Sequence, residues 1–324
     1  MEDGNDKLRI YILLGPTASG KSAVGLEVAE RIRAEIVSID SMQVYRGMDV
    51  GTAKPSVVER ARVPHHLIDL REPWESFSTA EYIAAADAAV REITARGRRA
   101  LFVGGTALYI KSLLVGIFEG PSADWEFRNR IRDEASRVGV ETLHKRLSEI
   151  DAEAAARIHP NDLRRIERAL EIYEKTGVKP SALRREWASG RLRYDARIAG
   201  LDVPREELYA RINARVDEMM TAGWLEEVSR LVADPRGLGR EASQALGYEE
   251  LARVVAGDAT LEYTVDEIKT RTRQFAKRQM TWFRSFPNVC WVDASMKGAR
   301  DKAARTREIA QAAIECFSKQ ERLD

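Results

Sequence analysis

The sequence predicts an α/β fold in which a parallel sheet is flanked by helices, with an all-helical subdomain inserted into the chain. Short apolar runs alternate with helix-like stretches in the first third of the sequence, a pattern typical of parallel strands joined by helices. A glycine-rich loop joins the first apolar run to the first helix-like stretch. The alternation then gives way to a long segment rich in arginine and glutamate, and apolar runs return only after it.

The expected strands are apolar runs bounded by Gly, Pro or Asp. They are Ile10–Leu14, Ile36–Ile39, His66–Leu70, Ala100–Val103, Arg197–Val203 and Val289–Val292. Helices are expected at Lys21–Arg33 and at Thr79–Arg96, where Ser78 and Thr79 give a capping signal. The tail, Ser295–Asp324, is helix-like and carries no motif, so we assign it no function.

The helix-like segment rich in arginine predicts the domain organisation. Breaks at Gly139, Pro160 and Pro180 divide it into several helices. We expect residues 124–194 to form a helical insertion, and residues 1–123 and 195–324 to form one catalytic core.

The most specific local motif is the phosphate-binding loop G-x-x-x-x-G-K-[ST], which follows the first expected strand and opens a helix. Its residues are Gly15, Pro16, Thr17, Ala18, Ser19, Gly20, Lys21 and Ser22. Backbone amides of such a loop bind a diphosphate at the helix N-terminus, Lys21 supplies a positive charge, and the Ser22 hydroxyl can ligate Mg²⁺. The core is therefore expected to be P-loop NTPase-like. The alternative is a glycine turn without a ligand.

The loop alone leaves the phosphate compound open, because kinases, GTPases and ATPases also use it. The N-K-x-D motif by which GTPases bind their base is absent. The strand Ala100–Val103 runs into Gly104-Gly105-Thr106 rather than into the magnesium-binding acid of an ATPase, which disfavours a conventional ATPase.

Further motifs follow in order along nearly the whole chain. They are Ser38–Tyr45, Gly47–Pro55, Pro64–Asp69, Gly104–Tyr109, Arg157–Asp162, Arg164–Glu171, Ala245–Tyr248 and Thr272–Arg284. In this order they closely resemble the tRNA dimethylallyltransferases. The resemblance implies transfer of a dimethylallyl group from dimethylallyl diphosphate to N6 of the adenosine 3′-adjacent to the anticodon, in tRNAs that read codons beginning with U. Eukaryotic relatives carry a C-terminal zinc finger that this sequence lacks, so the chain resembles the compact bacterial type.

Three residues are expected to be catalytic. Adenine N6 is a poor nucleophile, so the reaction needs a good leaving group and a base. By resemblance Asp40 accepts the N6 proton, and it lies at the carboxyl end of the second expected strand, where α/β sheets bind ligands. Lys21 would neutralise the departing diphosphate, and Thr106 is by resemblance a tRNA contact near the reacting groups. The alternatives are a strand-end cap or an indirect magnesium contact for Asp40, and a helix N-cap for Thr106.

The resemblance also implies a set of tRNA contacts. They are Asp40, Ser41, Met42, Gln43, Thr106, Arg128, Arg164, Arg165, Ile166, Glu167, Arg168, Gln244, Gly247, Tyr248, Lys277, Arg278, Gln279, Trp282 and Arg284. The family's helical insertion grips the anticodon stem-loop, and a second basic cluster follows Asn161 and Asp162 in this chain.

The segment Ile268–Phe286 holds six basic residues and no acid, interleaved with aromatic residues. Arg271, Gln274, Arg278 and Trp282 fall on one helical face. Basic groups at this density can follow a phosphate backbone, and planar groups can stack on unpaired bases. The alternative is an amphipathic helix with core aromatics and hydrated charges.

Composition bounds the remaining possibilities. The 324 residues are 44% hydrophobic, no segment approaches the length of a membrane span, and the N-terminus is polar, so we expect a cytoplasmic protein. The cysteines, Cys290 and Cys316, cannot build a disulfide framework or a four-ligand zinc site. We expect a monomer with Mg²⁺ as its cofactor and with tRNA and dimethylallyl diphosphate as its partners. Competing interpretations are an adenylate dimethylallyltransferase, a P-loop nucleotide kinase, and an RNA-binding module with a relic phosphate loop.

Overall fold

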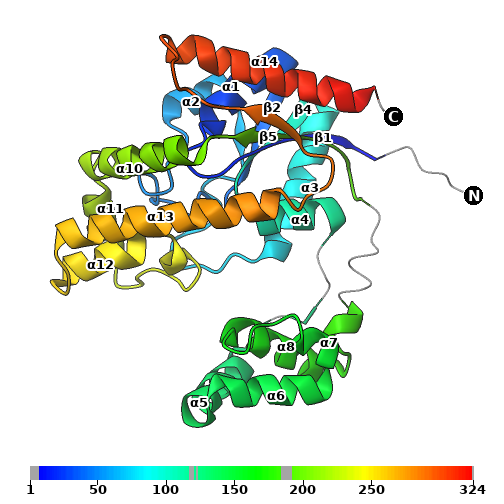
Figure 1. The fold of residues 1–324 in the computed structure, drawn as a ribbon, viewed down its shortest axis with the longest axis vertical. Coiled ribbons are helices and arrows are strands. Elements are labelled where there is room, and N and C mark those ends of the chain that lie inside the picture. Colours follow the sequence, from blue (N-terminus) through cyan, green and yellow to red (C-terminus); the bar gives the residue numbers. More distant parts are fainter. Residues whose placement is uncertain (1–6, 117–119, 122, 184–191, 323–324) are drawn as a thin grey trace, which may run out of the picture. The chain divides into compact units, whose positions relative to one another are not determined.

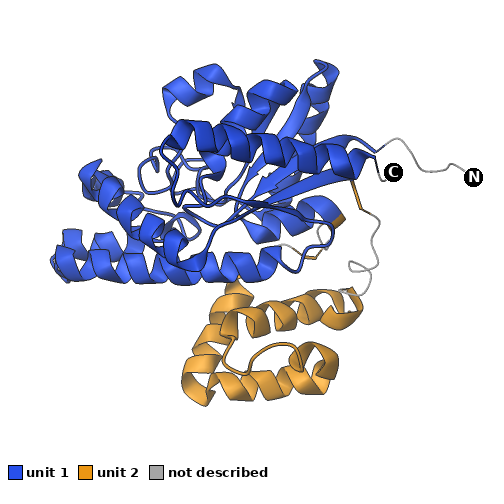
Figure 2. Cartoon of the chain, turned by 45° about the horizontal axis from the view of Figure 1, so that its top comes forward, with its two compact units in different colours: residues 1–114, 194–324 blue, residues 115–193 orange. Residues whose placement is uncertain are grey.

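The fold was obtained as a computed structural model that describes residues 7–116, 120–121, 123–183 and 192–322 (Figure 1). Residues 1–6, part of the polar N-terminus, and 323–324, the end of the expected helical tail, lie outside the described residues. The chain divides into two compact units, residues 1–114 with 194–324, and residues 115–193 (Figure 2). The second unit thus begins at Val115 rather than at Asp124. No described helix is both long and apolar enough to cross a membrane.

A parallel sheet of six strands forms the centre of the first unit, in the order β3-β2-β4-β1-β5-β6. The strands are β1 (Arg9–Leu14), β2 (Ala34–Ile39), β3 (His65–His66), β4 (Arg99–Gly104), β5 (Asp195–Asp202) and β6 (Cys290–Asp293). Leu14 and Ile39 both pair with Gly104, so β1, β2 and β4 end at one level. The parallel α/β fold predicted from the sequence is confirmed.

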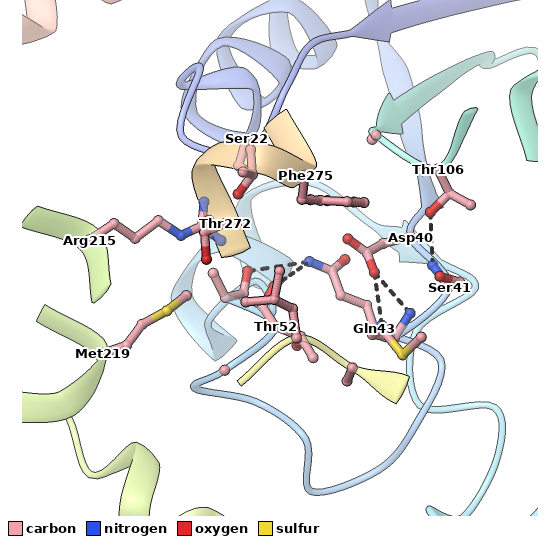
Figure 3. A pocket seen from close by; sticks show the side chains of 18 of the residues that line it. Ser22, Asp40, Ser41, Gln43, Thr52, Thr106, Arg215, Met219, Thr272 and Phe275 are labelled. Atoms are coloured by element: carbon pink, nitrogen blue, oxygen red, sulfur yellow. Dashed lines mark hydrogen bonds between the residues drawn. The ribbon is translucent and has the colours of Figure 1, made fainter. Parts of the chain in front are cut away.

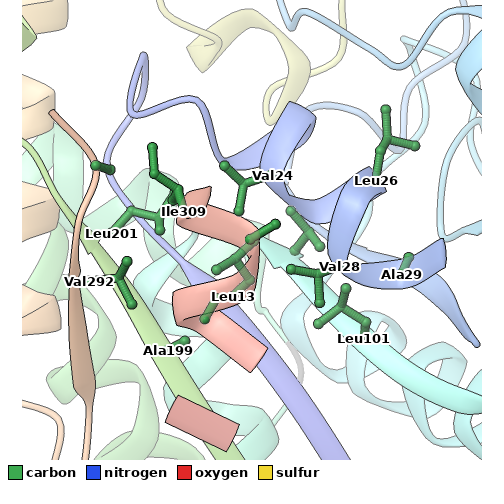
Figure 4. Packing of buried hydrophobic residues seen from close by; sticks show 14 of the residues in the cluster. Leu13, Val24, Leu26, Val28, Ala29, Leu101, Ala199, Leu201, Val292 and Ile309 are labelled. Carbon is green, nitrogen blue, oxygen red and sulfur yellow. The ribbon is translucent and has the colours of Figure 1, made fainter. Parts of the chain in front are cut away.

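Helices cover both faces of the sheet. On one face, α1 (Lys21–Ile32) and α14 (Lys302–Glu321) pack on every second strand residue, including Leu13, Leu101 and Leu201 (Figure 4). Figure 1 shows α3 (Thr79–Ala95) and α4 (Ala107–Val115) on the opposite side. Ser78 caps the N-terminus of α3, as its capping signal predicted, and Glu81 completes a capping box.

The remaining helices of this unit follow β2 and β5. They are α2 (Val57–Arg62), α10 (Arg205–Thr221), α11 (Trp224–Ala233), the short η1 (Ala242–Gln244), α12 (Tyr248–Ala256) and α13 (Leu261–Phe283). The long helix α13 packs against α10 and α12, and α11 packs against α12. These helices form a wall beside the carboxyl edge of the sheet, and the candidate site lies against it.

The second unit has a core of its own. Its helices are α5 (Trp125–Val138), α6 (Val140–Ile150), α7 (Ala152–Ala155) and α8 (Leu163–Thr176). Apolar residues at helical spacing, among them Phe127, Ile131, Leu147 and Ile166, pack together inside it. The regular elements of its described part are all helices.

One expected strand is largely wrong. The run His66–Leu70 forms a strand only at His65–His66, because Leu67 and Asp69 adopt left-handed backbone conformations with φ of 62° and 57°. Lys54 and Arg60 hold the Asp69 carboxylate at 2.7 and 2.8 Å, and these contacts fix the irregular backbone. Burial of Leu67 inside this irregular loop explains why the run is apolar without being a strand.

The C-terminal tail is part of the core. Helix α14 packs on α1 and contributes Ile309, Ala313 and Phe317 to the main hydrophobic cluster. A disulfide joins Cys290 of β6 to Cys316 of α14, with 5.7 Å between the two Cα atoms. A single bond of this kind is not a disulfide framework, but it links the last helix covalently to the edge strand.

Candidate active site

A cavity of about 530 Å³ opens where β1, β2 and β4 end. The loops that follow these strands form one side of it, and α10, α12 and α13 form the other (Figure 3). Carboxyl ends of neighbouring parallel strands meet at one edge, so the phosphate loop, Asp40 and Thr106 come together although they are far apart in sequence. Thr17, Lys21 and Ser22 are the phosphate-loop residues that line the cavity.

The phosphate loop has the backbone expected of an anion site. Gly20 adopts a φ of 87° just before α1, and Ala18 also has a positive φ. The Ser19 amide donates to the Pro16 carbonyl at 3.2 Å, which closes the loop. The N-terminus of α1, where backbone amides lack helical partners, thus lies at the cavity, where Lys21 and Ser22 line it.

Among the charged side chains that line the cavity, Lys21 and Arg215 both interact electrostatically with Asp40. Burial, together with the nearby Arg215, lowers the pKa of Lys21 to about 8, while Asp40 acts in the opposite direction. Burial also lowers the pKa of Arg215, against the attraction of Asp40 and Glu218. Two cations confined in one cavity make a site that favours a multiply charged anion.

Arg215 was missed by the sequence analysis. It lies on α10, in a stretch without a motif, and no spacing distinguishes it from the many other arginines of the chain. Its guanidinium makes no hydrogen bond or ion pair with any described residue, so its donors are free for a ligand. Figure 3 shows the side chain extending into the cavity from α10.

Asp40 is held in one orientation by the chain that follows it. Its Oδ1 accepts hydrogen bonds from the amides of Met42 and Gln43, at 2.9 and 3.4 Å. Among the described residues none donates to Oδ2. One carboxylate oxygen is thus fixed, and the other is available to a substrate proton.

Thr106 lies directly beside this turn. Its Oγ1 accepts a hydrogen bond from the Ser41 amide at 3.2 Å, and its own amide donates to the Ile39 carbonyl at 3.1 Å. Gly104 permits this close approach, since a Cβ there would lie 2.2 Å from the Ile39 oxygen. The loops after β2 and β4 therefore hold each other, and the hydroxyl of Thr106 contacts the turn of Asp40.

Gln43 is fixed by three hydrogen bonds. Ser38 Oγ donates to its Oε1 at 2.9 Å, and its Nε2 donates to the carbonyls of Thr52 and Ala53, each at 3.3 Å. Ser41, Met42 and Gln43 all line the cavity, as the expected substrate contacts should.

Gln279 has a role that differs from the expected tRNA contact. It is buried, its Oε1 accepts from the Thr17 amide at 2.9 Å, and its Nε2 donates to the Gly105 carbonyl at 2.8 Å. Both ends of the amide are occupied within the protein. Gln279 therefore joins α13 to the phosphate loop and to the loop after β4, and its contact with tRNA stays a prediction.

The basic face predicted on α13 borders the cavity. Arg271, Gln274, Phe275 and Arg278 line it, and Trp282 is exposed one turn further along. The basic residues of this run are not all exposed. Lys269 and Arg273 bind Asp217 and Asn213 of α10, whereas Lys277, Arg278 and Arg284 are exposed.

In the helical unit, the predicted basic cluster also divides. Arg164 and Arg165 are exposed, and Arg165 pairs only loosely with Asp162. Two other arginines, Arg128 and Arg168, bind the buried carboxylate of Glu171.

Ile166 and Glu167 are buried as well, and Glu167 pairs with Arg132. In this structure Ile166 packs in the core of the unit and Glu167 forms an internal ion pair, and their contact with tRNA stays a prediction. Because Arg128 and Arg168 are occupied by Glu171, they too stabilise the unit in this structure.

The motif Gln244 to Tyr248 contributes to the cavity wall. Gln244 is exposed at the cavity, whereas Tyr248 is fully buried and its hydroxyl donates to Glu227 at 2.6 Å. Gly247 packs on Trp224, and a Cβ there would lie 2.2 Å from the indole ring. Tyr248 therefore has a structural role in the wall, and its contact with tRNA stays a prediction.

Comparisons with known proteins agree with this geometry. The sequence profile of the IPP transferase family matches residues 43–286. The tRNA dimethylallyltransferase of Symbiobacterium thermophilum is 50% identical over 307 residues, covering 94% of this chain and 95% of that protein. The tRNA dimethylallyltransferase of Geobacillus kaustophilus is 44% identical over 305 residues, with the same coverage of both chains.

Two solved structures share the fold over most of their length. The full-length tRNA isopentenylpyrophosphate transferase of Bacillus halodurans is 39% identical, with a TM-score of 0.70 over 98% of this chain and 99% of that one. A eukaryotic dimethylallyltransferase acting on tRNA is 28% identical, with a TM-score of 0.78 over 93% of this chain and 78% of that one. The family inferred from the ordered motifs is confirmed, and the chain belongs to the IPP transferase family.

Proposed function

We propose that this protein is a tRNA dimethylallyltransferase, which transfers a dimethylallyl group from dimethylallyl diphosphate to N6 of the adenosine 3′-adjacent to the anticodon. The observation that carries the proposal is the arrangement of Lys21 and Arg215 with Asp40 in one cavity. A diphosphate needs the two cations, and an amine nucleophile needs the carboxylate. Relatives that carry this activity in their names align with nearly the whole chain.

The reaction breaks the bond between C1 of the dimethylallyl group and the diphosphate oxygen, and it forms a bond between C1 and adenine N6. The electron pair leaves with diphosphate, whose growing charge Lys21, Arg215 and the loop amides stabilise. The N6 proton passes to the free Oδ2 of Asp40. Since this proton becomes acidic as the new bond forms, an ordinary carboxylate suffices as the base.

The cavity also offers an apolar surface for the dimethylallyl group. Val216, Met219 and Phe275 line it alongside Arg215. Apolar walls exclude water from the allylic carbon, which protects it from hydrolysis. The same surface contributes about 25 cal/mol for each Å² of apolar area that the donor buries.

The residues at the phosphate loop fit Mg²⁺. The described residues contain no cluster of three His, Cys, Asp or Glu side chains that could hold a metal by itself. Magnesium in phosphate sites is usually bound by one or two protein oxygens together with substrate oxygens and water. The Ser22 hydroxyl faces the cavity and would supply such an oxygen (Figure 3). When bound, the ion would neutralise charge on the leaving diphosphate.

In this proposal, exposed basic groups bind the tRNA substrate. Arg278 and Trp282 of α13 suit the backbone and unpaired bases of an anticodon loop, while Arg164 and Arg165 of the helical unit suit the stem. The target base must leave its stack to enter the cavity, which is cheaper from a loop than from a duplex. The proposal includes a cytoplasmic monomer, because tRNA is the substrate and the reacting groups all come from one chain.

The direct test uses labelled dimethylallyl diphosphate, Mg²⁺ and unmodified tRNA. We expect label in RNA, at a single adenosine beside the anticodon, and none when AMP replaces tRNA. Label in AMP would instead favour an adenylate dimethylallyltransferase. Phosphate transfer from ATP without label transfer would favour a kinase.

A further inference from the structure

A buried carboxylate outside the reaction site holds the cavity wall together. Glu227 of α11 is 1% exposed. Its Oε2 accepts from the amides of Asp49 and Val50 at 2.8 and 2.7 Å, and its Oε1 accepts from the Gly51 amide at 3.2 Å and from the Tyr248 hydroxyl at 2.6 Å. The four hydrogen bonds that this carboxylate accepts thus come from one turn and from one neighbouring hydroxyl.

The turn that Glu227 binds belongs to the motif Gly47–Pro55, for which the reaction described above has no use. Gly51 packs against Trp224, and a Cβ on Gly51 would lie 2.1 Å from its Nε1. On the far side of the turn, the almost fully buried ammonium of Lys54 donates to the Tyr45 carbonyl at 2.7 Å. The turn is therefore held from both ends and packed tightly between them.

The same turn supports Gln43. Its carbonyls at Thr52 and Ala53 accept the two hydrogen bonds that Gln43 Nε2 donates (Figure 3). The backbone N–H of Gln43 in turn donates to Asp40 Oδ1. A short series of hydrogen bonds thus runs from Glu227 through the turn to Gln43 and ends at Asp40.

We infer that Glu227 is a positioning residue of the transfer reaction, which fixes Gln43 and Asp40 against the acceptor adenine by holding the turn at Asp49–Gly51. The inference rests on the proposed function. It gives the motif Gly47–Pro55 a purpose: the motif forms a rigid support whose backbone, rather than its side chains, orients the acceptor side of the cavity. The phosphate loop is not part of this series, so the donor side is independent of Glu227.

The substitution Glu227→Gln tests this chemistry with little change in volume. An amide oxygen can still accept from Asp49 and Val50, but the amide nitrogen then faces the Gly51 N–H, and two donors oppose each other. The turn must shift to separate them. We expect kcat for label transfer to tRNA to fall about 10- to 100-fold, the scale of a displacement near 1 Å, while the Kd for inorganic diphosphate stays within about two-fold.

The matched control is Glu226→Gln, which removes an exposed carboxylate from the same helix. It should leave both kcat and diphosphate binding unchanged. A loss of diphosphate binding in Glu227→Gln that equals its loss of kcat would overturn the inference, because the change would then be global.

A double-mutant cycle separates positioning from general destabilisation. If Glu227 acts through Gln43, Glu227→Gln should cost little further activity in a Gln43→Ala background. The same fold loss in both backgrounds would contradict the inference.

If Glu227→Gln fails to fold, Tyr248→Phe replaces it in the cycle, since it removes one of the four donors without adding an opposing one. A Tyr248→Phe loss that is additive with Gln43→Ala, or no loss at all, would equally reject the inference. Wild-type label transfer is measured in parallel, so failure of the proposed function remains a separate result.

Discussion

Gln279 of α13 accepts a hydrogen bond from the amide of Thr17 in the phosphate loop, across 2.9 Å. The helix that presents basic residues to the cavity therefore also holds the loop that receives the diphosphate. Because the other end of the same amide donates to the Gly105 carbonyl, one side chain fixes the relative positions of two catalytic loops and the helix.

Replacing Gln279 with leucine should weaken diphosphate binding. The substitution leaves the buried N–H of Thr17 and the carbonyl of Gly105 without partners, at a cost of about 1–3 kcal/mol for each unsatisfied group. Calorimetric titration with inorganic diphosphate should give a Kd at least about ten-fold higher. Thr281→Leu, at an exposed position on the same helix that does not line the cavity, should leave this Kd unchanged. Equal effects of the two substitutions would contradict the bridging role.

Diphosphate binding should depend on pH through Lys21. Burial and Arg215 lower the pKa of Lys21 to about 8 in the free protein. Above this pH the amine is neutral, so binding an anion requires uptake of a proton and affinity falls as pH rises. Below about pH 8 the ammonium is already present and this contribution to the pH dependence disappears.

The measurement is the Kd for inorganic diphosphate from pH 6.5 to 9.5 in wild type and in Lys21→Arg. A guanidinium stays protonated across this range, so the ratio of the two constants should change only above about pH 8. A ratio independent of pH would show that Lys21 remains charged throughout. Lys21→Ala should lower kcat by about 10²–10³ or more.

Asp40→Asn should separate binding from chemistry. The amide has the size of the carboxylate, and its oxygen can still accept from Met42 and Gln43, but it cannot take the N6 proton. We expect tRNA affinity within about two-fold of wild type and kcat lower by at least about 10², the scale of general-base catalysis. Loss of both in equal measure would mark Asp40 as a structural residue instead.

Two arginines of the helical unit should respond in opposite ways. Arg165 is exposed, so Arg165→Ala should weaken tRNA binding and reduce the slope of log K against log salt by about 0.7–0.9 without lowering the melting temperature. Arg128 binds the buried Glu171, so Arg128→Ala should destabilise the unit by about 3 kcal/mol. The test measures the salt dependence of tRNA binding and the melting temperature for both variants. An unchanged salt slope for Arg165→Ala would remove it from the tRNA surface.

The disulfide should contribute to stability more than to catalysis. Closing the chain between Cys290 and Cys316 restricts the unfolded state and stabilises the fold by about 3 kcal/mol. A reductant should lower the melting temperature by about 5 °C, and Cys316→Ser should melt at the reduced value with or without reductant. If reductant does not change the melting temperature of the wild type, the disulfide contributes nothing to the stability of the fold.

The sequence was sufficient where local chemistry decides the structure. The phosphate loop, the helix cap at Ser78 and the basic face containing Arg271 and Arg278 follow from local residue patterns alone. The sequence analysis failed where tertiary contacts override local preference. The run after His66 is apolar enough for a strand, but the ion pairs of Asp69 bend it into a loop.

The candidate site shows the same division. Asp40 could be placed because it directly follows a strand, and the family motifs pointed to it. Arg215 could not, because only the packing of α10 beside the sheet brings it to the cavity. In the same way, the family motifs pointed to Gln279 and Tyr248. Only the structure shows that both side chains are buried and form hydrogen bonds inside the protein.

The strand order has a consequence for synthesis. Strand β1 lies between β4 and β5, so one of its edges stays unpaired until Asp195–Asp202 has left the ribosome. Helices α5 to α8, which lie between β4 and β5 in the chain, form a separate unit with a core of its own, so they can fold before β5 is made. At about 5–20 residues per second the nascent chain carries an open apolar edge for several seconds. During that interval the edge is a template for pairing with another chain.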